Sequence, residues 1–305
     1  MERFDKLNSY FLEKERKRLD ALAKDNPGGL PEMSAAEIKL SCLENNGYEN
    51  PSLNDKLYLH FRGYKKIANL GPYSSCKAIW LDSNGLDTIE GLDDLVQLRC
   101  LYMSKNLITH INGLSSLKDL IILDLSYNRL SHLTNLSCCS SLQTINLARN
   151  CLATPDSIAH LIDCPSLHNV DVTNNKLEAD EGFMDVFQRI PNLKALSCNG
   201  NELSRLPHFR KRLVTLCPML GYLDRPIDER ERFVAAAFVS GGPEAEKVAI
   251  EGWREEQYRK KKEEMEESKR YREEQRAIRE EIRAKAAAEK AAREALVAQV
   301  VFLTS

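Results

Sequence analysis

Four stretches of the sequence repeat one pattern with a period of 22 residues: IWLDSNGL at 79–86, LYMSKNLI at 101–108, LDLSYNRL at 123–130 and INLARNCL at 145–152. Two longer turns follow, centred on Asn175 and Asn201. A degenerate first turn at 57–64, LYLHFRGY, has Arg where the others have Asn. Seven occurrences in phase predict a repeat architecture in which each unit packs mainly against its neighbours.

The shared pattern, L-x-L-x-x-N-x-L, is the leucine-rich repeat signature. Its alternation predicts a short strand whose apolar side chains face inward. After the Asn, apolar residues recur at every third position, as at Ile108, Ile111 and Leu114. That spacing favours 3₁₀-like turns, in which residues i and i+3 lie on one side. We therefore predict an α/β solenoid with parallel strands on the concave face and 3₁₀ or helical turns on the convex face.

One asparagine per repeat predicts a structural ladder. The side-chain amide both donates and accepts hydrogen bonds, so it can satisfy backbone groups where each strand ends. The predicted members are Asn84, Asn106, Asn128, Asn150, Asn175 and Asn201.

The segments outside the repeats predict caps and a charged helix. Residues Ser34 to Glu37 match a capping box at the start of a lid helix. The predicted units are an amphipathic helix and linker at 1–32, an N-terminal cap helix at 33–52, about seven repeats at 53–205, a C-terminal cap at 206–226, a linker or short helix at 227–252 and a charged helix at 253–300.

The charged segment alternates Glu with Lys and Arg, and pairs such as Glu256 and Lys260 are four residues apart. Apolar residues are sparse there and do not sustain three clean heptads. A solvated single helix or spacer is therefore favoured over a coiled coil, which stays the alternative.

Composition excludes several classes of function. Lys and Arg number 43 against 45 Asp and Glu, so no global positive field is present to hold nucleic acid. Nine scattered cysteines without a C-x-x-C pair indicate reduced, intracellular usage. No secretory signal is visible, and no segment approaches the roughly 20 apolar residues that span a bilayer. These features predict a cytosolic or nuclear protein with no membrane segment.

No catalytic, phosphate-binding or metal-ligand motif occurs in the sequence. His110 and His132 share a repeat phase, but two ligands do not make a metal site. We therefore expect no enzyme activity, no cofactor, no metal and no small-molecule substrate.

The repeat register instead predicts a binding face, because residues between the inward apolar pair point to the concave side. Exposed Trp and Tyr groups often anchor protein partners. The predicted partner-binding residues are Tyr58, His60, Trp80, Asp82, Tyr102, Asp124, Asn146 and Asp171. The alternative is that the chain's own N-terminal helix covers the aromatic residues.

Two segments that flank the repeats carry a family resemblance. They are NDKLYLHFRGY at 54–64, and YLDRP at 222–226 followed by AAAFVSGG at 235–242, Ala245, Glu246 and Trp253. With the 22-residue repeats they resemble the axonemal dynein assembly factor 1 family of ciliary proteins. Two features differ from that family: Asp-Arg-Pro at 224–226 lacks a second Asp, and the long acidic tail of larger members is missing.

The resemblance implies a non-catalytic adaptor for cytoplasmic preassembly of axonemal dynein arms, which cilia and flagella need for motility. The implied partners are dynein chains and assembly chaperones or co-factors, and the implied location is the cytoplasm, in association with the cilium or flagellum. One alternative is a regulatory subunit that binds a type-1 protein phosphatase through the concave face. A further alternative is a spliceosomal partner that grips an RNA-binding domain.

Overall fold

The computed structural model describes residues 32–303, and side chains as far as residue 288. The chain divides into two compact units, one up to Val239 and one from Ser240. The N-terminal helix predicted within residues 1–32 falls almost wholly outside the described residues.

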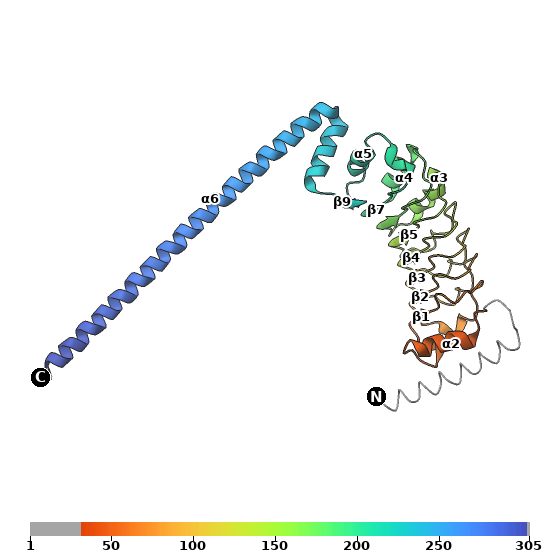
Figure 1. Ribbon diagram of the computed structural model, residues 1–305, viewed down its shortest axis with the longest axis horizontal. Coiled ribbons are helices and arrows are strands. Elements are labelled where there is room, and N and C mark those ends of the chain that lie inside the picture. The colour runs from red at the N-terminus through yellow and green to blue at the C-terminus, as the bar shows by residue number, and fades with distance from the viewer. Residues whose placement is uncertain (1–31, 304–305) are drawn as a thin grey trace. The chain divides into compact units, whose positions relative to one another are not determined.

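The first unit is built around one sheet whose strands lie side by side in chain order (Figure 1). Strands β1 to β8 pair in parallel, and β9 pairs antiparallel with β8. The strands are β1 (Lys56–Tyr58), β2 (Ala78–Trp80), β3 (Cys100–Tyr102), β4 (Ile122–Asp124), β5 (Thr144–Asn146), β6 (Asn169–Asp171), β7 (Ala195–Ser197), β8 (Tyr222–Leu223) and β9 (Arg225–Pro226). This order confirms the predicted α/β solenoid.

The middle residue of each three-residue strand is buried and lies opposite its counterpart in the next repeat. Leu57 aligns with Ile79, and Ile79 with Leu101, and all three are at most 1% exposed. Burying a leucine or isoleucine stabilises the fold by roughly 1.5–3 kcal/mol. Since each contact is shared between neighbouring repeats, the core is continuous along the solenoid.

The convex side differs in part from the prediction. In the middle repeats it consists of single i→i+3 turns, such as the hydrogen bonds from Leu95 N to Leu92 O (3.0 Å) and from Leu98 N to Leu95 O (2.9 Å), rather than continuous 3₁₀ helix. Regular helices occur where the repeats are longer or at the ends: η1 (Pro51–Leu53), η2 (Gly71–Tyr73), α3 (Pro155–Ile158), η3 (Ala159–Asp163), α4 (Gly182–Arg189) and η4 (Glu202–Arg205).

A helix covers the N-terminal end of the stack. Helix α2 (Ala35–Glu44) begins at the predicted capping box, with Glu37 N donating to Ser34 Oγ (3.2 Å) and Ser34 N to Glu37 Oε2 (3.4 Å). The Ser41 hydroxyl donates to the Tyr58 carbonyl of β1 (2.5 Å). This contact ties the cap to the first strand.

The C-terminal end is closed by α5 (Phe209–Leu216), β8, β9 and the start of α6 (Glu229–Leu303). The Arg232 guanidinium donates to the carbonyls of Val214 (3.0 Å) and Leu220 (2.6 Å). The ring of Phe238 lies 4.4 Å from that of His208. The first turns of α6 therefore belong to the cap.

Helix α6 is interrupted at Gly242, whose φ of 69° and ψ of −160° are not helical, and Pro243 follows. A positive φ is accessible to glycine without a Cβ penalty, and proline is well suited to the first position of a helix. The long charged helix therefore starts at Pro243 rather than at the predicted Trp253. The sequence at 243–252 lacks the dense pairing of opposite charges that marks the rest, so this boundary escaped the prediction.

Candidate partner-binding surface

Six of the eight predicted binding residues are the last residues of strands β1 to β6, which line the inner side of the curved repeat unit (Figure 1). The other two, His60 and Asp82, lie two residues beyond the ends of β1 and β2. Because side chains alternate along a strand, the first and third residues face this side when the middle one is buried. All eight predicted residues are half-buried.

Three aromatic rings form a continuous stack on this concave face. The centroids of Tyr58 and Trp80 are 4.7 Å apart with an interplanar angle of 14°, and those of Trp80 and Tyr102 are 5.2 Å apart with an angle of 13°. The stack arises because each ring is the third residue of its strand and parallel pairing aligns these positions. Burial, followed by the Cys100 thiol, raises the pKa of the Tyr102 phenol, which stays protonated as a hydrogen-bond donor at neutral pH.

Two more aromatic side chains extend the stack at its N-terminal end. His60 contacts Tyr58 edge to face (6.5 Å) and Phe61 likewise (5.5 Å). Phe61 is 73% exposed and adopts a φ of 56°. The sequence reasoning missed Phe61. It occupies the position just before the Asn of the other repeats, and the residue at this position has a positive φ in several of them, as at Lys105 and Tyr127.

The predicted acidic residues accept hydrogen bonds from backbone N–H groups. Asp82 Oδ1 accepts from Ser104 N (2.9 Å), Asp124 Oδ1 from Ser126 N (2.9 Å), and Asp171 Oδ1 from Thr173 N (2.8 Å). Asn146 Oδ1 accepts from Ala148 N (3.1 Å) in the same way. The Asn146 amide also donates to Asp124 Oδ2 (3.2 Å), which brings two of the predicted residues together.

Further residues of this face were missed because the prediction considered only the third residue of each strand and the residue two positions after it. The first residues of the strands form a third column, which includes the exposed Lys56 and the half-buried Cys100 and Ile122. Beyond the strands, Lys105 and Arg149 lie against the ring of Tyr127, 5.8 Å and 5.0 Å from its centroid. The first residues of the strands and the residues around Tyr127 both recur with the period of the repeat, so the sequence could have identified them.

The asparagine ladder is formed. Asn128 Nδ2 donates to the carbonyls of Met103 (2.9 Å) and Leu125 (3.0 Å), and its Oδ1 accepts from Ile108 N (3.0 Å). Each member therefore joins its own repeat to the preceding one. Equivalent bonds are made by Asn84, Asn106, Asn150, Asn175 and Asn201.

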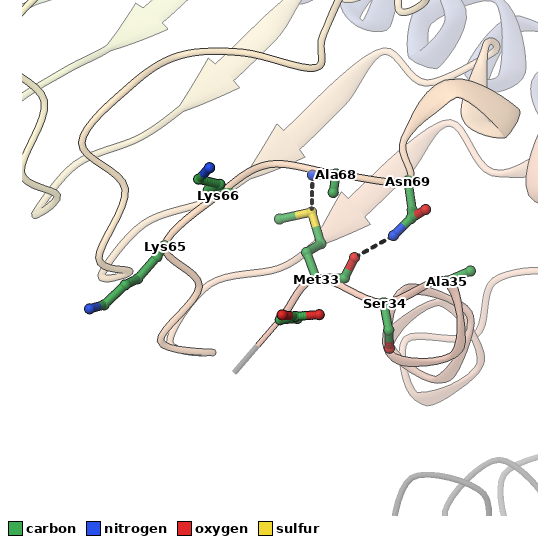
Figure 2. A pocket seen from close by; sticks show the side chains of 8 residues that line it. Met33, Ser34, Ala35, Lys65, Lys66, Ala68 and Asn69 are labelled. Carbon is green, nitrogen blue, oxygen red and sulfur yellow. Dashed lines mark hydrogen bonds between the residues drawn. The ribbon is translucent and has the colours of Figure 1, made fainter. Parts of the chain in front are cut away.

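A cavity of about 470 Å³ lies beside the N-terminal cap (Figure 2). Met33 lines it and is held by the Asn69 amide, which donates to the Met33 carbonyl (2.8 Å). Lys65 and Lys66 lie at its rim and point away from Met33. Ser34 also lines the cavity, and its hydroxyl accepts the hydrogen bond from Glu37 N that caps helix α2.

Two negative findings concern the described residues alone. Among the side chains described, those of residues 32–288, no cluster of three or more from His, Cys, Asp or Glu is arranged to hold a metal ion. Within 32–303, no helix has both the length and the apolar character needed to cross a bilayer.

The fold and this face define a leucine-rich repeat protein with capped ends and a long charged helix. No family model matches the chain. Comparison with curated proteins shows that it is homologous to proteins named dynein axonemal assembly factor 1 and to one named leucine-rich repeat-containing protein ODA7, which confirms the resemblance carried by the flanking segments.

Three relatives illustrate this homology. The leucine-rich repeat-containing protein ODA7 of Chlamydomonas reinhardtii is 56% identical over 218 residues, which are 71% of this chain and 50% of that protein. Dynein axonemal assembly factor 1 of Homo sapiens is 46% identical over 75% of this chain and 32% of its own length. The Drosophila melanogaster homolog is 42% identical over 81% of this chain and 16% of its own. The chain thus spans half or less of the length of these relatives.

Solved structures similar to this chain include two internalins of Listeria monocytogenes. One has a TM-score of 0.46 with 20% identity over 61% of this chain and 53% of its own. The other, internalin C2, has a TM-score of 0.47 with 19% identity over 59% and 75%.

Proposed function

We propose that this chain is a non-catalytic adaptor for the cytoplasmic preassembly of axonemal dynein arms. The observation that carries the proposal is its 42–46% identity to proteins named for that assembly, over 75–81% of the chain. The adaptor binds dynein chains, or the chaperones that fold them, before delivery to the cilium or flagellum.

The concave face is the part of the molecule that performs the binding. Its aromatic stack combines large apolar area with the polar tips of Tyr58, Trp80 and Tyr102, the combination that anchors protein partners. The long helix serves as a spacer, since its surface is dominated by paired charges such as Glu281 and Lys285 (2.7 Å).

The comparisons do not support the phosphatase alternative. The relatives given above are named for axonemal dynein assembly or for their repeats, and none of those names refers to a phosphatase.

A rescue experiment in a ciliated cell that lacks the endogenous protein tests the function. The chain should restore dynein arms in electron micrographs of axonemes, and it should co-purify with dynein heavy chains or chaperones from cytoplasmic extract. Leu107→Arg, at an exposed position outside the strands, serves as the control variant. Recovery of phosphatase or spliceosomal proteins without dynein chains or chaperones would contradict the proposal.

A further inference from the structure

The concave face carries negative charges that the fold does not require. Asp124 and Asp171 each accept a backbone N–H bond from the residue two positions later. In the intervening repeat, Asn146 accepts the equivalent bond from Ala148 N with a neutral amide. Since an amide oxygen fulfils this structural role, the carboxylate charge at the other positions needs a different explanation.

These charges have no ionic partner within the part of the chain that the structure describes. Asp82, Asp124 and Asp171 are half-buried on the face, and none forms an ion pair with a described residue. Their backbone bonds fix the direction of each carboxylate. The face thus presents three oriented negative groups to solvent.

The spacing of the three aspartates matches the rise of an α-helix. They belong to the second, fourth and sixth repeats, so two strand spacings separate each from the next. At about 4.8 Å per strand, this is about 10 Å. Seven residues of an α-helix rise about 10 Å at 1.5 Å per residue. Asp124 and Asp171 end their strands, whereas Asp82 lies two residues beyond the end of its strand. Asp82 is therefore displaced by about 7 Å along the strand direction, and the three residues do not lie on one straight line.

The aromatic stack offers an apolar surface beside the first of these charges. Trp80 and Asp82 are two residues apart on the same side of the chain, and Tyr102 lies one strand before Asp124. The exposed ring of Phe61 adds to this apolar surface. An apolar ridge at one end and carboxylates along the face complement an amphipathic helix whose polar side is basic.

We propose that the concave face binds an amphipathic α-helix of a partner protein, one that places Lys or Arg side chains seven residues apart opposite Asp82, Asp124 and Asp171. Its apolar residues pack on Trp80 and Tyr102. This inference rests on the proposed function, because it specifies the partner chemistry at the same face.

A synthetic helix tests the recognition without knowledge of the natural partner. The probe is an alanine-rich peptide of about 21 residues with arginines seven residues apart and leucines beside them on one face. The control peptide has the same composition with the arginines five residues apart, which places them on different sides. Binding to the full chain is followed by Trp80 fluorescence in a Trp253→Phe background. The first peptide should bind more tightly than the control, and the addition of salt should weaken it.

Variants at the aspartates provide the matched test. Asp124→Asn and Asp171→Asn should each weaken the first peptide about two- to five-fold, as exposed ion pairs do, and the triple variant with Asp82→Asn more than tenfold. The melting temperature should be nearly unchanged because Asn146 already makes the bond that Asp124 and Asp171 make, and because an amide oxygen at position 82 can accept from Ser104 N as the carboxylate does. Asp119→Asn is the charge-matched control, because it removes an exposed carboxylate that lies outside the strands.

Two results would overturn the inference. Equal affinity for both peptides would show that a basic segment of any shape suffices, and unaltered binding to the triple variant would show that the carboxylates are not recognised. The cellular rescue separates this inference from the proposed function. If the triple Asn variant restores dynein arms fully, the helix inference fails while the adaptor role stands. If the unaltered chain restores none, the adaptor role fails, and the peptide titration still decides what the face binds.

Discussion

The indole of Trp80 lies parallel to the phenol ring of Tyr102, with the ring centroids 5.2 Å apart on the concave face. Replacing both with alanine should abolish partner capture and lower stability only modestly. The rings are half-buried, and an aromatic pair contributes about 0.5–1.5 kcal/mol beyond its buried area. Loss of the Tyr58–Trp80 and Trp80–Tyr102 contacts should therefore lower the melting temperature by a few degrees, measured by circular dichroism.

Tyr258→Ala is the control for this double variant, since Tyr258 is 74% exposed and lies on the charged helix rather than on the concave face. Unfolding of the double variant would show that the two rings belong to the core rather than to a binding surface.

The repeat core could be predicted from the sequence because period and chemistry agree. Leu101, Leu123 and Ile145 occupy one phase of the pattern, and the structure aligns them in register and buries them almost completely. The asparagine ladder could be predicted for the same reason, since an amide that follows every strand can bond to backbone groups of its own repeat and of the preceding repeat. Once the register of one repeat is known, the equivalent residues of all the other repeats are known as well.

Details that depend on the environment of one side chain could not be predicted. The aspartates were predicted as partner-binding residues from their position alone, and the structure adds that each of them is bonded to a backbone N–H. The sulfurs of the neighbouring Cys138 and Cys139 are 3.8 Å apart, and both thiols approach the Leu114 carbonyl of the preceding repeat. Such contacts come from the adjacent repeat, which the local sequence pattern does not specify.

Leu125→Arg should prevent folding of the repeats. Leu125 is 0% exposed in the middle of the stack, so the substitution places an unpaired charge there at a cost of several kcal/mol. Leu107→Arg, at a site that is 40% exposed in the same region, should leave the urea midpoint almost unchanged. A soluble Leu125→Arg protein with a normal urea transition would show that the repeat register is wrong.

Asn128→Ala should destabilise the protein more than most polar substitutions. It removes the donor to the Met103 and Leu125 carbonyls and the acceptor for Ile108 N, all in a buried position. Each buried group left unpaired costs about 1–3 kcal/mol, so we expect a loss of at least 2 kcal/mol in the free energy of unfolding.

The control for the ladder is Asn112→Ala. Asn112 is exposed and accepts a hydrogen bond from Asn135 Nδ2 (3.1 Å) on the surface. Urea unfolding should show a change within about 0.5 kcal/mol for this variant. Equal losses for the two variants would mean that the ladder contributes no more than a surface bond.

Stability should fall steeply under alkaline conditions. Burial raises the pKa of the Cys76 and Cys139 thiols from 9.0 to about 12, and that of the Cys42, Cys164 and Cys217 thiols from 9.0 to about 11. Above pH 9 the unfolded chain loses these protons while the folded chain retains them. The stabilisation is therefore complete below pH 9 and is lost as the pH rises toward 11, by about 1.4 kcal/mol per pH unit for each thiol.

Urea midpoints measured at neutral pH and at about pH 10 check this slope. Cys76→Ala should make the slope shallower, whereas Cys151→Ala, which removes a half-exposed thiol, should leave it unchanged. A midpoint independent of pH across this range would show that the thiols are accessible to water in the folded state.

Arg232→Ala should loosen the C-terminal cap selectively. The Arg232 guanidinium donates to the Val214 and Leu220 carbonyls, which would otherwise lack these partners at the end of α5 and before β8. Loss of charge-assisted bonds to two carbonyls should cost about 2–3 kcal/mol. Hydrogen exchange should then accelerate for amides at 209–223 and remain slow in the strands of the middle repeats.

Arg232→Lys should recover only part of the protection, because one ammonium cannot reproduce the forked geometry. Arg230→Ala, at an exposed position two residues away on the opposite side of the helix, should leave hydrogen exchange unchanged. Equal acceleration throughout the repeats would indicate global unfolding instead of cap opening.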